Sequence, residues 1–159
     1  MKFNSALRNF ILVVFSTLLI SACSTAKKAS VDTSDDVYTG TETVEFLAKG
    51  VPDRVFFATN KSSLTTRSRD TLRKQATFLR KNKDVNVTIE GHADERGTRE
   101  YNLALGERRA NAVKDYLLTY GVSGKRMSVI SYGKEKPVNP ASTPLAWSQN
   151  RRSVTVKTN

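Results

Sequence analysis

The fold is decided by one stretch of the chain, residues 90–117, which reads EGHADERGTREYNLALGERRANAVKDYL. Just before it, three apolar residues alternate with polar ones, the period of a half-buried strand: Val85, Val87 and Ile89. A helix is expected over residues 99–120, with a core stripe made of Val113, Tyr116, Leu117 and Tyr120. Gly121 follows as the C-terminal cap. The stretch therefore predicts a strand, a short turn with Gly97, and a long helix.

The rest of the folded part follows the same alternation. Further strands are expected at residues 54–59, 128–132 and 153–157, and a first long helix is expected over 65–80. That helix carries apolar residues at helical spacing: Leu72, Ala76 and Leu79. A long loop between the last two strands contains Gly133, Pro137, Pro140 and Pro144. The order β-α-β-α-β-β predicts an α/β sandwich, in which a mixed sheet packs on two long helices.

The N-terminus has the pattern of a secretion signal. Lys2 and Arg8 form a basic region, and residues 10–20 form an apolar run. This run is about half of the ~20 residues that a membrane-spanning helix needs. Residues 19–23, LISAC, resemble a bacterial lipoprotein box, which implies cleavage before Cys23 and acylation of that cysteine. We expect a membrane-anchored protein with a signal peptide over residues 1–22.

Cys23 is the only cysteine, so neither a disulfide nor a cysteine-bound metal is expected in the mature chain. Residues 24–50 are polar, small and aperiodic, a composition that does not bury enough apolar surface to fold alone. We therefore expect a lipidated Cys23 with a flexible tether over residues 23–50 and a single folded domain over residues 51–159.

The charge balance favours anionic partners. The chain carries a net charge of +11, and loss of Lys2 and Arg8 with the signal peptide leaves +9. A cytosolic protein with this charge would suggest nucleic acid, but export removes that partner. Acidic cell-wall polymers and lipid head groups remain, and charge that serves solubility alone is an equal alternative.

The cluster around His92 admits several kinds of site. A metal site is disfavoured because His92 is the only histidine and a zinc site needs three or four ligands. His92 with Asp94 or Glu95 could act as an acid/base pair, as in an enzyme that cleaves the cell wall. However, the sequence has no identifiable nucleophile motif, and adjacent carboxylates are poorly placed to flank a glycosidic bond. We expect no catalytic residues and no metal, and we expect His92 to bond neighbouring backbone.

A binding site is better supported by the helical phase. Asn102, Leu105 and Arg109 recur at helical spacing, and seven residues bring Asn102 and Arg109 to within about 20° of one face. Asp94 closes the preceding strand beside the N-terminus of this helix. A carboxylate, a guanidinium and free helix N–H groups suit a small zwitterion, with its ammonium on Asp94 and its carboxylate on Arg109. The alternative is an Asp94–Arg109 ion pair that only braces the strand against the helix.

These residues also carry a family resemblance. The spacing of seven positions resembles the OmpA-like peptidoglycan-binding motif: Asp94, Leu105, Gly106, Arg109, Ala110, Val113 and Leu117. Four sequence segments are similar to those of the Pal family of peptidoglycan-associated lipoproteins: EGHADERGT, LGERRANAVK, SYGKEKP and NRR. The resemblance covers about residue 51 to the C-terminus, and the lipoprotein box and tether agree with it.

The resemblance implies a non-enzymatic lipoprotein without cofactors, anchored in the outer membrane through Cys23, whose domain faces the periplasm. It implies non-covalent binding of peptidoglycan through diaminopimelate, with Asp94 on the ammonium and Arg109 on a carboxylate. Thr98, Asn102 and Leu105 would line the pocket. TolB and other proteins of the Tol-Pal system, which acts in envelope integrity and cell division, are the implied partners. A peptidoglycan-cleaving enzyme and a module that chiefly binds Tol proteins are the alternatives.

One position departs from the family pattern. The first strand of Pal-like proteins ends in Phe-Asp or Phe-Asn at the border of the pocket, whereas this chain has Phe57 followed by Ala58. Ala58 offers only its backbone, although Thr59 or Asn60 could compensate. The preference among stem-peptide forms is therefore left open.

Overall fold

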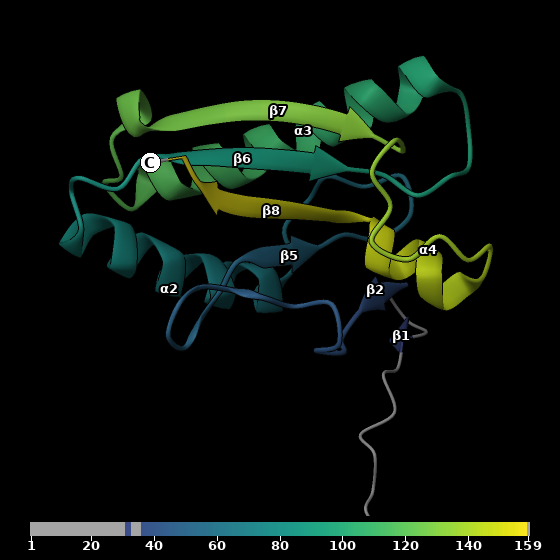
Figure 1. Ribbon diagram of the computed structural model, residues 1–159, viewed down its shortest axis with the longest axis horizontal. Helices are drawn as coiled ribbons and strands as arrows, with labels where there is room; N and C mark the ends of the chain where they lie inside the picture. Colours follow the sequence, from purple (N-terminus) through teal and green to yellow (C-terminus); the bar gives the residue numbers. More distant parts are fainter. Residues whose placement is uncertain (1–30, 33–35, 159) are drawn as a thin grey trace, which may run out of the picture.

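The computed structural model describes residues 31–32 and 36–158. The expected signal peptide and Cys23 lie outside these residues. The centre of the fold is a mixed four-stranded sheet in the order β5-β8-β6-β7 (Figure 1). Its strands are β5 (Arg54–Phe56), β6 (Val87–His92), β7 (Met127–Gly133) and β8 (Arg152–Lys157). β6 and β7 are parallel, and β8 is antiparallel to both β5 and β6.

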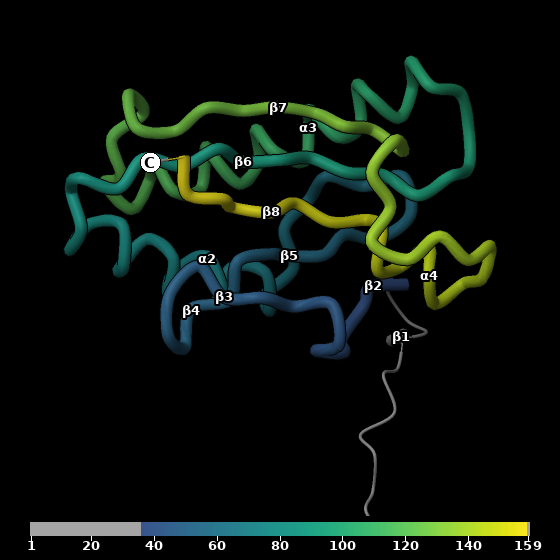
Figure 2. Tube along the Cα trace, in the orientation of Figure 1, coloured from purple at the N-terminus to yellow at the C-terminus, as the bar shows by residue number. Residues whose placement is uncertain are grey.

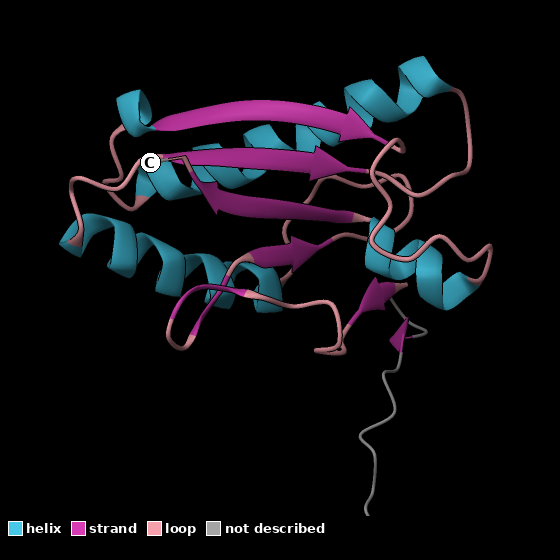
Figure 3. Ribbon diagram, in the orientation of Figure 1, coloured by secondary structure: helices cyan, strands magenta, loops and turns pink. Residues whose placement is uncertain are grey.

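Two long helices, α2 (Thr66–Lys81) and α3 (Arg99–Thr119), cover one face of the sheet, which confirms the predicted α/β sandwich (Figure 3). A short 3-10 helix, η1 (Gly124–Arg126), precedes β7. No helix in the described part of the chain is long and apolar enough to cross a membrane. The core between helices and sheet includes the predicted stripe of α2 and, from α3, Val113 and Leu117. Its fully buried members include Phe57, Leu72, Leu79, Ile89 and Leu117.

The C-terminal end of α3 differs in one detail from the expected stripe. Tyr120 is 36 % exposed and stacks on Tyr116 at the surface, with ring centroids 5.0 Å apart. The expectation that Tyr120 belongs to the core is therefore wrong, because the helix ends at Thr119 and Tyr120 is its C-terminal cap residue. Gly121 has a φ of +79°, the left-handed conformation expected of a residue just beyond a helix.

The contact between β6 and α3 is set by two glycines. A Cβ atom on Gly91 would lie 1.8 Å from the carbonyl oxygen of Gly106. A Cβ on Gly106 would in turn lie 2.9 Å from the carbonyl oxygen of Gly91. Only glycine allows the two backbones to approach this closely. This close approach fixes the N-terminal part of α3 against the end of β6.

The segment between β7 and β8 is more ordered than expected. It was predicted as a loop, but it contains α4 (Pro144–Asn150). The Thr143 hydroxyl accepts a hydrogen bond from the backbone N–H of Ala146 at 3.2 Å. Pro144 occupies the first turn, where a missing N–H costs nothing. The proline that indicated a loop therefore begins a helix.

The folded region also begins earlier than residue 51. Residues 36–50 contain β2 (Val37–Tyr38), which pairs with β1 (Val31–Asp32), and β3 (Phe46–Ala48), which pairs with β4 (Val51–Pro52) (Figure 2). Tyr38 is fully buried and meets the Phe56 ring edge-on, with centroids 4.7 Å apart. Leu47 belongs to the main core. The expected tether is therefore wrong for residues 36–50, because scattered apolar residues in this polar segment dock onto the sheet.

Candidate ligand-binding site

The residues singled out by the sequence gather at one end of the sheet. Asp94 follows β6, Ala58 follows β5 and Arg151 immediately precedes β8. The N-terminus of α3 begins at the same end, on the right of Figure 1. The Ala93 N–H donates to the carbonyl of Gly133 at 2.7 Å, which extends the pairing of β6 and β7 up to Asp94. Strand ends and a helix N-terminus therefore converge, as expected.

The start of α3 is shaped by its own side chains. The Thr98 hydroxyl caps the helix by accepting from the N–H of Tyr101 at 3.2 Å. Asn102 is 2 % exposed, and its Nδ2 donates to the carbonyl of Arg96 at 2.9 Å. Gly97 allows the turn between them with a φ of +92°. Leu105 is buried below Asn102 on the same helix. The three expected pocket residues Thr98, Asn102 and Leu105 thus order this turn.

Asp94 is a buried carboxylate held by two arginines. Arg96 donates from Nε to Oδ1 at 3.0 Å and from Nη2 to Oδ2 at 2.7 Å. Its backbone N–H also reaches Oδ1, at 3.1 Å. Arg151 donates from Nη1 to Oδ2 at 3.2 Å. Burial acts to raise the pKa of Asp94, but the hydrogen bonds from Arg96 and Arg151 lower it below its ordinary value. Asp94 is therefore ionised at neutral pH.

Arg109 is fully buried and bonds only to backbone. Nε donates to the Lys61 carbonyl at 2.9 Å, Nη1 to the His92 carbonyl at 2.7 Å and Nη2 to the Ala58 carbonyl at 3.1 Å. Burial, followed by the positive charge of Arg151, lowers the pKa of Arg109 to about 10. The guanidinium joins the ends of β5 and β6, and it remains charged at neutral pH.

The alternative that the sequence left open, an Asp94–Arg109 ion pair that only braces the strand against the helix, does not form in the described structure. None of the ion pairs within 4.0 Å in the described part of the chain involves Arg109. The reason is competition, because Arg96 and Arg151 already bond both oxygens of Asp94. Arg109 thus remains a buried cation that lacks a carboxylate partner among residues 36–158, while Asp94 lies in the same site.

Sequence reasoning missed Arg151, which is 1 % exposed and central to the site. Its Nε donates to the carbonyl of Phe57 at 3.1 Å, and its Nη2 lies 2.9 Å from Oδ1 of Asp36. Arg151 thus connects Asp94, the end of β5 and the segment before β2. The signal for it was the NRR run at the start of the last strand, because strand alternation places one of two adjacent arginines on the inner side.

Phe57 and Ala58 contribute differently from each other. Phe57 is fully buried, and the Arg109 guanidinium lies 5.3 Å from the centre of its ring. Ala58 provides no side-chain acceptor, but its carbonyl binds Arg109. The adjacent Thr59 hydroxyl accepts from Nη2 of Arg96 at 3.3 Å and also bonds the Asp36 carboxylate. A polar group therefore borders the site one residue beyond the position where the family pattern has Asp or Asn.

An aromatic rim lies outside the carboxylate. The Arg96 guanidinium lies 4.4 Å from the centre of the Trp147 ring. Trp147 Nε1 donates to Glu95 Oε1 at 2.8 Å, and Ser142 donates to Glu95 Oε2 at 3.1 Å. These bonds lower the pKa of Glu95 below its ordinary value. Glu95 is thus occupied in orienting the rim from α4, which is itself an element that the sequence did not predict.

The His92 side chain makes no hydrogen bond of ordinary geometry to the backbone of the described residues, although a backbone group of Lys136 lies close enough to raise its pKa. The His92 carbonyl faces Arg109, but neither ring nitrogen has a hydrogen-bond partner in the described structure. Among the described residues, no three potential metal ligands of the His, Cys, Asp or Glu type lie together. The ring points to the sheet face that carries no helix, so it lies apart from Asp94.

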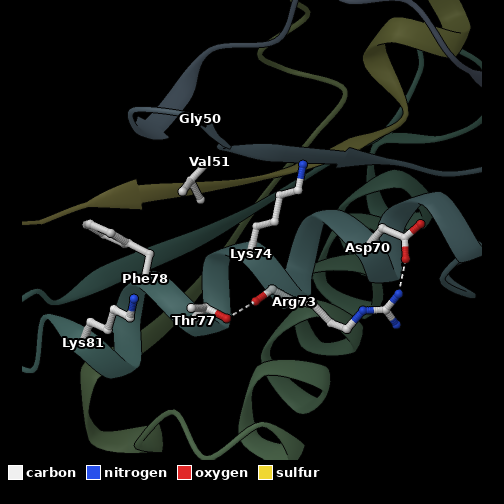
Figure 4. A pocket seen from close by; sticks show the side chains of 8 residues that line it. All are labelled: Gly50, Val51, Asp70, Arg73, Lys74, Thr77, Phe78 and Lys81. Carbon is white, nitrogen blue, oxygen red and sulfur yellow. Dashed lines mark hydrogen bonds and ion pairs between the residues drawn. The ribbon is translucent and has the colours of Figure 1, made fainter.

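A separate hollow of about 780 Å³ lies between α2 and the β3–β4 turn (Figure 4). Three of its polar residues are engaged with one another. Arg73 binds Asp70, and the Thr77 hydroxyl donates to the carbonyl of Arg73 at 2.9 Å. None of the expected site residues lines it. Size alone therefore does not locate the site, which is defined by its buried charges.

Comparison with known proteins agrees with this arrangement. The OmpA family profile matches residues 56–151, which include every described site residue discussed above except Asp36. The peptidoglycan-associated lipoprotein of Brucella melitensis is 43% identical over 150 residues, covering 91% of this chain and 89% of the relative. That of Rhizobium meliloti is 58% identical over 106 residues, 67% of this chain and 60% of the relative. This chain thus matches less than two thirds of that relative's length.

Solved structures give the same result. The crystal structure of the peptidoglycan-associated lipoprotein from Burkholderia pseudomallei has a TM-score of 0.65 to this chain at 39% identity. The match covers 67% of this chain and 90% of the other. The strand ends, the buried arginines and the cap of α3 are thus placed on a scaffold of known type. The chain belongs to the OmpA family and, within it, to the peptidoglycan-associated lipoproteins.

Proposed function

We propose that this protein is a non-enzymatic lipoprotein that binds peptidoglycan through the diaminopimelate residue of the stem peptide. The observation that carries the proposal is the coexistence of two buried opposite charges that do not pair, Asp94 and Arg109. A zwitterionic end group offers each of them its complement. Diaminopimelate has such an end group, with an ammonium and a carboxylate on one carbon.

The ammonium binds at Asp94 in place of Arg96. The Arg96 side chain is 42% exposed, whereas that of Asp94 is 8% exposed, so Arg96 can move into solvent without disturbing the core. Arg96 then serves as an internal cation that keeps the carboxylate ionised until the ligand arrives. Arg151 is buried and remains on Asp94, which fixes the position of the carboxylate.

The carboxylate of the ligand binds near Arg109. A guanidinium has five N–H groups, of which Arg109 uses three on carbonyls. A bidentate carboxylate is the partner that suits a planar guanidinium best. Because Arg109 is fully buried, the segment around Lys61, whose carbonyl accepts from Nε, has to shift on binding. We therefore expect the exchange at Asp94 to precede binding at Arg109.

The cellular setting follows from the same family. The protein is anchored in the outer membrane through lipid on Cys23, and residues 36–158 fold in the periplasm and bind the wall. TolB and other Tol proteins are the protein partners, and the anchored wall contact supports envelope integrity during division.

Co-sedimentation with purified peptidoglycan tests the proposal. The full chain in detergent should sediment with the wall, and an Asp94→Ala variant should retain less than a tenth of that binding. Asp70→Ala is a matched control, because Asp70 is an exposed aspartate on α2 outside the site. Equal binding by the Asp94→Ala and Asp70→Ala variants would contradict the assignment. Release of cleaved muropeptides during the incubation would instead favour an enzyme.

A further inference from the structure

The sheet face that carries no helix contains a second hollow of about 610 Å³. It is lined by residues of β3, of the segment 136–138 that follows β7, and of β5, β6 and β8. The helix-free face of the sheet is turned toward the viewer in Figure 1. Strand alternation brings four charged or titratable side chains to this face: Arg54, Glu90, His92 and Arg152. The Asp94 site is at the end of the sheet, so the two sites share the backbone of His92 and no side chain.

His92 lines this hollow with an unsatisfied ring. The residue is 1% exposed, and both ring nitrogens are buried without a hydrogen-bond partner in the described structure. The Glu90 carboxylate is 3.6 Å from Nε2, too far for a hydrogen bond. Burial, then the charges of Arg152, Arg54 and Lys136, lowers the pKa of His92 to about 3, and a long hydrogen-bonding contact with the backbone of Lys136 acts in the opposite direction. A neutral imidazole thus presents one unused N–H.

Arg152 adds an unsatisfied donor to the same hollow. Its Nε is buried without a partner among the described residues. Nη2 donates to the Lys136 carbonyl at 3.2 Å, and Nη1 makes a long contact of 3.5 Å to the Asn150 carbonyl. Burial and the nearby Arg54 lower the pKa of Arg152 to about 10. No carboxylate in the described part of the chain lies within 4.0 Å of this guanidinium.

Arg54, the other arginine that lines the hollow, has a carboxylate partner, which Arg152 lacks among the described residues. It binds Asp53 through Nε at 2.7 Å and through Nη2 at 2.6 Å. Asp53 is therefore already occupied, and Glu90 does not reach Arg152. A buried cation without a counter-ion is costly unless an anion from outside completes it. The charge pattern thus indicates an incoming carboxylate.

Exposed apolar side chains lie beside the charged residues that line the hollow, which indicates a peptide and not a lone ion. Phe46 is 63% exposed, Val156 is 39% exposed and Val138 is 37% exposed. The hollow is also far larger than one water or one small anion, each of which fills about 30 Å³ or somewhat more. An acidic side chain next to an apolar one matches both the buried donors and the exposed apolar side chains.

We propose that this hollow binds an acidic peptide segment of a partner protein. A carboxylate side chain of the segment accepts hydrogen bonds from Nε of Arg152 and from the ring N–H of His92. An adjacent apolar side chain packs on Phe46 and Val138. The site is independent of peptidoglycan binding, because it uses neither Asp94 nor Arg109.

The single histidine of the chain provides a direct probe. The ring signals of His92 are followed by NMR in the ¹⁵N-labelled full chain in detergent, during titration with N-acetyl phenylalanyl-aspartyl amide. We expect a saturable shift that is at least tenfold weaker with the matched phenylalanyl-asparaginyl amide. Equal responses to the two dipeptides, or no response, would overturn the proposal. Inorganic phosphate that binds as tightly as the aspartyl dipeptide would also overturn it, since it would indicate a plain anion site.

Variants separate this role from a structural one. Arg152→Gln should weaken binding of the aspartyl dipeptide at least tenfold, and Glu90→Gln should strengthen it severalfold by removing a competing charge. Phe46→Ala should weaken binding, whereas Leu118→Ala, an exposed apolar residue on α3, should not. If Arg152→Gln fails to fold, the opposite responses of Glu90→Gln and Phe46→Ala decide the question. Unchanged affinity in both of these variants would contradict the site.

Discussion

Arg151 and Arg152 are neighbours in the chain, yet their surroundings differ completely. Both are buried, at 1% and 7% exposure. Arg151 binds two carboxylates, those of Asp94 and Asp36, whereas Arg152 binds only carbonyls. Since consecutive residues of a strand point to opposite sides, one arginine holds the site at the sheet end and the other lines the face without helices. The same residue type thus forms structural ion pairs at position 151 and, in the described structure, leaves a hydrogen-bond donor unsatisfied at position 152.

The largest loss of stability is expected on the helix-covered side of the sheet, where the backbones of β6 and α3 approach most closely. Gly91→Ala places a Cβ 1.8 Å from the Gly106 carbonyl, so β6 and α3 must separate. We expect a loss of unfolding free energy on the order of 4 kcal/mol or more, or no folding, in urea denaturation. Gly124→Ala is the control, since its Cβ meets only Leu118 at 3.4 Å. Equal stability of the two variants would contradict the close contact.

The next largest effect is the difference in unfolding free energy lost when Arg151 or Arg152 is replaced. Arg151→Gln removes one partner of a buried pair and should cost about 3 kcal/mol of unfolding free energy. Arg152→Gln removes a buried cation without a carboxylate partner in the described structure and should cost less than about 1 kcal/mol. Denaturant titration of both variants at pH 7 measures the contrast. Equal costs would show that the two surroundings are energetically alike.

The pH dependence of the unfolding free energy should show that the buried His92 ring is neutral. Its pKa is lowered from 6.5 to about 3 in the folded protein, so the unfolded chain takes up a proton first as the pH falls. Stability from this group is complete above pH 6.5 and is lost from there towards pH 3. Between pH 7 and pH 5 the loss should be about 2 kcal/mol, or less. His92→Gln should remove this part of the pH dependence, and an unchanged profile would contradict the buried neutral ring.

Asp94 should change the unfolding free energy at lower pH than His92 does, and by a smaller amount. Its pKa lies below the ordinary 3.8, so its stabilising contribution is present above that value and is lost as the pH falls through the lower folded pKa. The difference in unfolding free energy between the wild type and Asp94→Asn should therefore stay constant from pH 7 to pH 5. It should narrow below about pH 4. A difference that narrows already at pH 6 would show that Asp94 is not held by arginines.

The periodic elements were predictable and the cross-chain contacts were not. The strand over Val85 to Glu90 and the helix after Thr98 have clear periods, and the phase of α3 correctly placed Asn102 and Arg109 on one buried face. The arginine partners of Asp94 were not predicted, and the position of one of them, Arg151, depends on how β8 is inserted between β5 and β6. Sequence spacing does not reveal that insertion. Sequence spacing also gives no sign that Arg151 is buried in the site or that the ring of His92 is unsatisfied.

Short elements were lost for a different reason. The strands in residues 36–50 are two or three residues long, too short to show alternation. Their order depends on docking of Tyr38 against Phe56. Likewise, the seven residues of α4 lie among prolines and serines that are typical of a loop. In both places tertiary contact outweighs local composition.

The central claim is that Asp94 and Arg109 together bind a zwitterionic end group. Calorimetric titration of the full chain in detergent with a diaminopimelate-containing stem peptide tests it most directly, against the same peptide with lysine. The lysine analogue keeps the ammonium for Asp94 but lacks the carboxylate for Arg109. We predict that it binds at least tenfold more weakly than the diaminopimelate peptide. Equal affinity for the two peptides would contradict the account.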